Sequence, residues 1–151
     1  MKRFLFRLEP VLGLRAAKEN EAQEKYGRAS QAVQRAEEDL AEAQTELDRL
    51  QEVLNTSRHG RFSKNDQIIS LNAIGYQQAI CQRAADRLGI LKKEAAARLQ
   101  DLLDARRAHE VLQRLRAKQQ AQHQRETERR EQVAVDDAVM ARFARPNQST
   151  I

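Results

Sequence analysis

Apolar or small side chains recur between Tyr26 and Leu54 at spacings that alternate between three and four residues. The repeat consists of Tyr26, Ala29, Val33, Ala36, Leu40, Ala43, Leu47, Leu50 and Leu54. This alternation is the heptad pattern of a coiled coil, and most positions between are Glu, Gln, Arg or Asp. Only a narrow stripe of such a helix can be buried. The segment is therefore restricted to a helix that packs along one seam against another helix.

The ends of this helix are marked by residues with strong positional preferences. Pro10 suits the first turn of a helix, where its missing N–H is no loss, and the apolar stripe extends back to Leu12. Gly60 interrupts the pattern at the other end. We predict a first helix over residues 10–57 and a hairpin turn over residues 58–65.

Capping residues predict the start of the second helix. Ser63 and Asn65 are typical N-cap residues, and Asp66 carries the charge that a helix N-terminus favours. The apolar positions that follow are Ile68, Ile69, Leu71, Ile74, Ile80, Cys81, Ala84, Leu88, Leu91, Ala95, Leu99, Leu102, His109, Leu112 and Leu115. Their spacing slips between Ala95 and Leu99, which predicts a stutter that locally unwinds the supercoil.

No further stop signal precedes Pro146, so we predict a second helix over residues 66–144 and a short tail over residues 146–151. Gly75 and Gly89 each weaken this helix by about 1 kcal/mol relative to Ala. Gly75 in particular marks a candidate break within it.

These elements predict an all-α fold, a single antiparallel two-helix coiled-coil hairpin whose second helix is longer than the first. Folding the chain about the turn places the start of helix 1 opposite about residue 112 of helix 2. From Gln113 the sequence is polar all round, and apolar residues return only in a short terminal group between Val133 and Phe143. Helix 2 should therefore outrun helix 1 by about 30 residues, roughly 45 Å at helical rise.

Composition argues against a thick core and against a catalytic site. The chain has no Trp, and 32% of its residues are charged. No Ser/His/Asp or Cys/His arrangement or phosphate-binding glycine loop is present, so we expect neither an enzyme nor a cofactor. Cys81 has no partner for a disulfide, and the histidines stand too far apart to indicate a metal site. We expect His59 and His123 to be solvated.

No apolar stretch has the length of a signal-peptide core or a transmembrane helix, so we expect a cytoplasmic protein with no direct membrane insertion. The formal net charge is +5, but it is unevenly distributed. Residues 18–52 carry ten acidic and five basic side chains, whereas residues 113–132 carry six basic and three acidic ones. A basic end can be a solvated face, can bind an acidic protein surface, or can bind nucleic acid. Glu and Gln interrupt this basic run and no aromatic residues accompany it, so nucleic acid is not expected.

Three segments of the chain together resemble a known family. The start reads Phe4-Leu5-Phe6-Arg7-Leu8-Glu9-Pro10-Val11-Leu12-Gly13-Leu14-Arg15, similar to an F-x-F-R-L-x-x-V-L-x-L-R opening. Residues 106–115 resemble an R-R-x-x-E-x-L-x-x-L stretch, and residues 129–143 resemble an R-R-E-Q…D-(D/E)…R-F ending. These patterns, their order and their spacing resemble the FliJ family of flagellar type III export proteins.

The resemblance implies a non-enzymatic stalk on the cytoplasmic side of the inner membrane, attached peripherally through the export apparatus. Its partners would be the hexameric flagellar export ATPase, the cytoplasmic part of the membrane export gate and, as a further class, export chaperones. The residues implied in ATPase binding are Arg7, Arg15, Arg114, Arg125, Arg129, Arg130 and Phe143. Those implied in gate binding follow a Y-Q-x-aromatic pattern and are Tyr76, Ala79, Ile80 and Arg83, although Ala79 and Arg83 depart from the family's usual residues.

Two alternatives remain open at the level of the sequence. One is the coiled-coil stalk of a virulence-type type III secretion system. The other is a basic coiled coil that binds nucleic acid, which would show steeply salt-dependent DNA binding.

Overall fold

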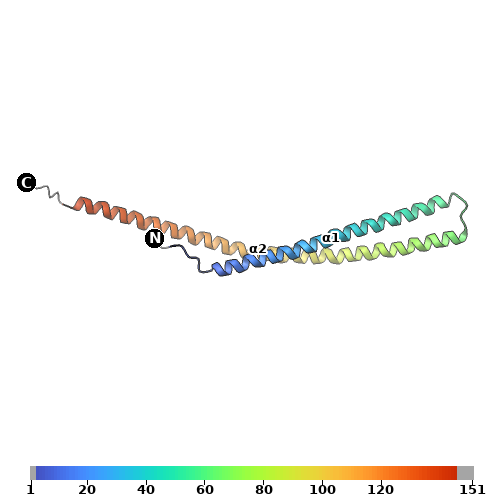
Figure 1. Cartoon of the computed structure of the whole chain (residues 1–151), viewed down its shortest axis with the longest axis horizontal. Coiled ribbons are helices and arrows are strands. Elements are labelled where there is room, and N and C mark those ends of the chain that lie inside the picture. The colour runs from blue at the N-terminus through green and yellow to red at the C-terminus, as the bar shows by residue number, and fades with distance from the viewer. Residues whose placement is uncertain (1–2, 146–151) are drawn as a thin grey trace, which may run out of the picture. The chain divides into compact units, whose positions relative to one another are not determined.

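The computed structural model describes residues 3–145, which form two α-helices packed as a hairpin (Figure 1). Helix α1 runs over Glu9–Ser57 with 49 residues, and helix α2 runs over Lys64–Ala144 with 81 residues. The residues that the structure describes contain no strand. The predicted all-α hairpin with a longer second helix is confirmed. The tail at 146–151 lies outside the described residues.

The described chain divides into two compact units, each containing parts of both helices. The hairpin unit comprises Lys18–Ala105 and includes the turn. The terminal unit comprises residues 3–17 together with residues 106–145. The two units are described separately below.

Helix α1 begins and ends with local hydrogen bonds that replace the missing helical ones. Pro10 is its second residue, within the first turn as predicted. The backbone N–H of Glu9 donates to the Phe6 carbonyl at 3.1 Å. At the other end the N–H of His59 donates to Thr56 O at 3.3 Å and that of Gly60 donates to Ser57 O at 3.2 Å. These i to i+3 bonds tighten the chain before the turn.

The start of α2 is fixed by a reciprocal cap. The N–H of Asp66 donates to Ser63 Oγ at 3.1 Å, and the Ser63 hydroxyl donates to Asp66 Oδ2 at 2.8 Å. Such an N-cap stabilises a helix by about 1 kcal/mol. With Ser63 as the cap the helix starts at Lys64, two residues before the predicted start. Asn65, also predicted as a capping residue, lies inside the first turn.

The predicted α1 seam is present in the hairpin unit. All nine of its residues, from Tyr26 to Leu54, are half-buried or buried, and the most buried are Ala36, Ala43 and Leu54. Because many of these side chains are alanines, each layer buries less apolar area than a leucine layer, which limits its contribution to stability. The small side chains also let the two helices approach closely.

The α2 seam differs from the predicted one. An unbroken alternation of three and four runs through the buried and half-buried residues Gln67, Ser70, Ile74, Gln77, Cys81, Ala84, Leu88, Leu91, Ala95, Arg98, Leu102 and Ala105, with Ala73, Ile80 and Leu103 half-buried beside it. The predicted stutter is wrong because Arg98, and not Leu99, continues the seam. Leu99 is 38% exposed. The aliphatic stem of an arginine can line a seam while its guanidinium reaches solvent, so a charged residue can hold this position.

A polar layer connects the two helices near the middle of the hairpin unit. The side-chain amide of Gln77 donates a part-buried hydrogen bond to the backbone carbonyl of Ala43 at 3.0 Å. A single polar residue in a coiled-coil seam specifies register, because sliding the helices leaves it without a partner. The methyl side chain of Ala43 leaves room for this approach. Gln77 therefore fixes which residues of α1 and α2 face each other.

Helix α2 is continuous through Gly75 and Gly89, so the candidate break at Gly75 does not occur. No glycine among the described residues has a positive φ. A Cβ added at Gly75 or Gly89 would meet no atom within 4 Å. Neither position requires glycine for its backbone conformation or its packing.

We predict that Gly75→Ala and Gly89→Ala each increase the free energy of unfolding by about 0.5–1 kcal/mol, because alanine loses less backbone entropy in a helix. Urea unfolding followed by circular dichroism at 222 nm measures the change. Gly27→Ala, at an equally open position of α1, is the matched control and should behave alike. Destabilisation at Gly75 alone would mean that the helix bends there in solution.

Candidate interaction surfaces

The residues before α1 form a short strap along α2 within the terminal unit. Phe6 is only 8% exposed, and the ring of Phe4 lies 5.6 Å from the ring of His123 at an angle of 56°. Leu5, between the two phenylalanines, is exposed. This alternation over residues 3–6 is that of an extended segment with one side on α2, and a turn at residues 7–8 joins it to α1. We name residues 3–8 the aromatic strap.

The aromatic strap changes the expected pairing of α2. An ion pair of 3.1 Å joins Arg116 Nε to Glu9 Oε2, and the strap continues beyond it to His123. An extended residue advances about 3.3 Å and a helical one about 1.5 Å, so a few strap residues cover about two turns of α2. Half-buried side chains on α2 consequently continue to Thr127. The expectation that α2 is unpartnered from Gln113, and that His123 is solvated, is wrong.

Every described side chain from 128 to 145 is exposed, and we name this segment the α2 tip. Val135, Val139 and Phe143 follow one another at intervals of four residues and so share one side of the helix. Phe143 is 84% exposed. A run of exposed apolar side chains on one helix face is characteristic of a surface that a partner covers.

The positive charge of the terminal unit is not spread over the whole overhang of α2, as expected, but lies outside the α2 tip. Its described residues carry thirteen basic and seven acidic side chains, a net of +6. All of this excess lies outside the α2 tip, which has four basic and four acidic residues. The predicted basic overhang therefore comprises two surfaces. One is a basic paired portion, and the other is the α2 tip, which has no net charge and one apolar side.

The residues implied in ATPase binding all lie in the terminal unit and are all exposed: Arg7, Arg15, Arg114, Arg125, Arg129, Arg130 and Phe143. Arg7 belongs to the aromatic strap, and Arg15 lies in the second turn of α1. Arg114 is 3.9 Å from Glu110 on its own helix, a weak contact that leaves the guanidinium available to a partner. Arg129, Arg130 and Phe143 lie on the α2 tip.

The residues implied in gate binding lie in the hairpin unit. Tyr76, Ala79, Ile80 and Arg83 follow an i, i+3, i+4, i+7 pattern and so share one face of α2. Tyr76 is 67% exposed, Ala79 and Arg83 are also exposed, and Ile80 is half-buried beside the seam. The face is thus available to a partner except where Ile80 contributes to the hairpin packing.

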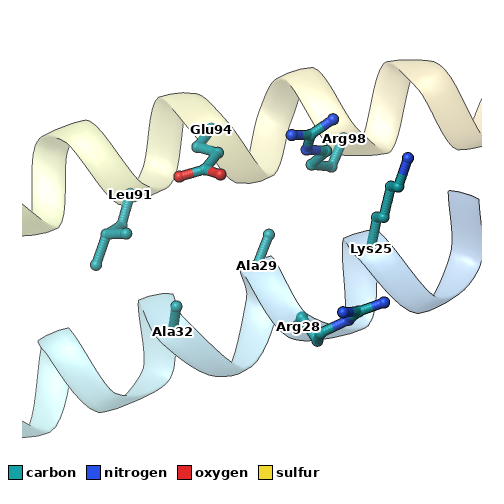
Figure 2. Close-up of a pocket in the computed structure, with 7 residues that line it drawn as sticks. All are labelled: Lys25, Arg28, Ala29, Ala32, Leu91, Glu94 and Arg98. Atoms are coloured by element: carbon teal, nitrogen blue, oxygen red, sulfur yellow. The ribbon is translucent and has the colours of Figure 1, made fainter.

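Shallow grooves between the helices follow the alanine-rich part of the seam in the hairpin unit. One of about 260 Å³ is lined by Lys25, Arg28, Ala29, Ala32, Leu91, Glu94 and Arg98 (Figure 2). A neighbouring groove of about 230 Å³ shares Lys25 and Arg98 with it and adds Lys18, Glu21, Ala22 and Asp101. A third, of about 180 Å³, is lined by Ala36, Asp39, Arg83, Ala84 and Arg87. Small seam residues leave this space unfilled.

Two carboxylates in α1 of the hairpin unit, those of Glu21 and Glu46, are paired with cations on the same helix. A hydrogen bond from Lys25 and its positive charge hold the pKa of the Glu21 carboxyl below its usual value. Arg49 likewise lowers the pKa of Glu46 by donating two hydrogen bonds, and the pKa of Arg49 itself is raised by that contact. Both carboxylates stay ionised at neutral pH. These exposed pairs set local charge and add little stability.

Residues 3–145 show no cluster of metal-ligating side chains, since no group of three or more His, Cys, Asp or Glu side chains there is arranged to hold a metal ion. The buried residues of the same range are all hydrophobic. Neither helix, over its described length, contains a stretch apolar enough to cross a membrane.

Comparison with known proteins assigns the family. The sequence model of the flagellar FliJ protein matches residues 4–148, nearly the whole chain. The chain belongs to the FliJ family. Neither the curated proteins nor the solved structures gave a significant match.

Membership in the FliJ family identifies a coiled-coil protein related to flagellar type III export, with protein partners in the export apparatus. The F-x-F-R opening of this family member also has a structural role, because the Phe4 ring contacts His123 of α2 and Phe6 is buried. The sequence contained one signal for this contact, the alternation of two aromatic residues with Leu5 and Arg7 before a helix-starting proline.

We predict that Phe4→Ala combined with Phe6→Ala releases the aromatic strap and speeds backbone hydrogen exchange in α2 residues 113–127 by about tenfold or more. The loss of apolar contact should leave residues around Gln77 unaffected. Hydrogen-deuterium exchange with mass spectrometry measures both regions. Leu5→Ala, a change at an exposed position of the same segment, serves as the control, and equal exchange in the double variant and the control would contradict the strap.

Proposed function

We propose that this FliJ family protein is a stalk of the flagellar type III export apparatus, that its terminal unit binds the hexameric export ATPase, and that its hairpin unit contacts the membrane export gate. The observation that carries the proposal is the α2 tip, an exposed helix with an apolar side, adjoining a strongly basic paired portion. A helix whose apolar side is exposed to solvent is stabilised when a partner covers that side. The function is that of an adaptor with no chemistry of its own.

The terminal unit offers two complementary kinds of contact for the ATPase. The net charge of +6 favours an acidic partner surface and accelerates encounter, while the apolar side of the α2 tip supplies area to bury. Phe143 is suited to be an anchor, because large aromatic residues contribute heavily to protein interfaces. Arg125 and Arg129 lie on or beside the side of α2 that carries Val135, Val139 and Phe143, and Arg130 lies on the opposite side. Each guanidinium can pair with a carboxylate in bidentate fashion.

The gate contact is proposed for the face that contains Tyr76, Ile80 and Arg83. Its apolar residues are offset by an exposed guanidinium, a combination that suits a mixed apolar and acidic partner surface. A protein with one site for the ATPase and another for the gate can link the two on the cytoplasmic side of the inner membrane. Export chaperones are a further class of partner in this setting.

The ATPase contact can be tested by charge reversal. We predict that changing Arg114, Arg125, Arg129 and Arg130 together to Glu weakens binding to the purified hexameric ATPase by about tenfold or more, because opposite charges are replaced by like charges. Surface plasmon resonance gives the affinity, and stimulation of ATP hydrolysis gives a second readout.

The matched control changes Arg58, Arg61, Lys64 and Lys93 to Glu, which alters the net charge equally but at exposed positions of the hairpin unit. If the variant with four changed arginines in the terminal unit binds the ATPase as tightly as the unchanged chain, or if the control weakens binding equally, the terminal unit is not the ATPase-binding site. Tight DNA binding that falls steeply with salt would favour the nucleic-acid alternative.

The gate contact is tested with Tyr76→Ala combined with Arg83→Glu. We predict that this variant loses binding to the isolated cytoplasmic part of the gate by about tenfold while its ATPase binding is unchanged. Gln78→Ala combined with Lys93→Glu is the control, because both residues are exposed, Gln78 points away from this face, and Lys93 lies about 15 Å farther along α2. Full gate binding by the test variant would remove this face from consideration.

A further inference from the structure

The two flanks of the coiled coil in the hairpin unit differ. With heptad letters a and d given to the seam, starting from Tyr26 and Gln67 as a positions, the helices meet through their g positions on one flank and their e positions on the other. On the e flank, Lys92 Nζ lies 3.7 Å from Glu37 Oε1, so a long ion pair crosses between the helices. The g flank lacks such a crossing pair among the ion pairs described.

The three grooves described above all open on the g flank. Every residue that lines them is at a c, d or g position, and none is at b, e or f. In the close-up, Ala29 and Ala32 of α1 and Leu91 of α2 lie between the helices, with the charged residues spread along the two edges (Figure 2). The grooves therefore form one hollowed flank with an apolar floor.

The rim of this flank is basic although the unit that contains it is acidic. The lining residues include six cations, namely Lys18, Lys25, Arg28, Arg83, Arg87 and Arg98. They include four anions, namely Glu21, Asp39, Glu94 and Asp101. The whole hairpin unit has thirteen basic and fifteen acidic residues, a net of −2, so positive charge is concentrated at the grooves.

Several of these cations are incompletely neutralised. Arg28 is 3.8 Å from Glu24, and Arg98 is 3.8 Å from Asp101, both near the limit of an ion pair and both on their own helix. Arg87 has no ion pair or hydrogen bond with another described residue. Beside the floor, Ile90 is 67% exposed at a c position.

We propose that the g flank of the hairpin unit is a docking groove for a third helix, an amphipathic helix of a partner protein with acidic residues beside its apolar stripe. Two helices packed through small residues leave a furrow that accepts a helix, as in helix-in-groove recognition. Alanines on the floor permit close approach, Leu91 and Ile90 supply apolar contact, and the arginines meet the acidic edges. A second copy of this chain is disfavoured because two basic rims would face each other.

The probe is a peptide of about 21 residues, three heptads, with Leu and Ala in its stripe and Glu at the flanking positions. A second peptide has Lys in place of every Glu. We expect the acidic peptide to bind the full-length chain at least about tenfold more tightly than the basic one, and to gain helicity on binding. Fluorescence anisotropy measures affinity, and difference circular dichroism measures helicity.

The groove variant changes Arg28, Arg87 and Arg98 to Glu, and its control changes Arg58, Arg61 and Lys93 to Glu with the same net charge change. We expect about a tenfold loss for the groove variant and less than about a threefold loss for the control. Because Arg98 is a seam residue, Ile90→Ser is a second groove variant at an exposed position, and it should also weaken binding. Arg83 belongs both to the groove rim and to the proposed gate face. Tyr76 and Arg83 are therefore left unchanged, and peptide binding is measured without the gate present, so that a failure here and a failure of the gate contact are distinguishable.

Three results would overturn the proposal. These are equal binding of the acidic and basic peptides, equal loss in the groove and control variants, and binding without a gain in helicity. Sedimentation velocity of the chain without peptide tests whether a second copy of the chain occupies the groove. A dimer that Ile90→Ser and the groove variant both abolish would identify a second copy as the natural occupant and would also overturn it.

Discussion

Close packing of small side chains along one seam is the interaction on which the rest of this structure depends. Ala36 and Ala43 are among the most buried residues, and their size sets how near α1 and α2 can come. That closeness allows the Gln77 amide to reach the Ala43 carbonyl, which fixes register. It also leaves unfilled space beside the seam, because alanines cannot fill the volume that leucines would occupy. The alanines of the seam thus have two effects: they allow the contact that fixes the register of α1 against α2, and they leave the grooves beside the seam.

The sequence predicted the elements well because heptad periodicity and capping chemistry act locally. The α1 seam, the turn and the greater length of α2 all follow from spacing and from residues such as Pro10 and Ser63. The errors arose where a polar residue took a place that periodicity alone would give to an apolar one. Arg98 is half-buried at the seam position and Leu99 is exposed. The aliphatic stem of an arginine can pack in a seam, and a hydrophobicity pattern that counts arginine as polar does not register it.

The surfaces were harder to predict than the fold. Charge counting identified a basic end, but only the positions of the side chains separate the basic paired portion from the neutral, apolar α2 tip. The contact of Phe4 with His123 joins residues near the two ends of the chain, and no local pattern could announce it. Family membership and structure therefore contribute different things, since the family supplies the export context and the structure shows which side chains are exposed together on each surface.

The aromatic strap has a consequence for the order in which the molecule folds. In a hairpin, contacts beside the turn join residues close in sequence, and those farther from the turn require progressively larger loops to close. Capping by Ser63 should therefore come early, pairing should spread away from the turn, and the docking of Phe4 on His123 should come last. A docked aromatic strap then indicates a fully folded chain, because the surface around it forms only after the two helices have paired in register.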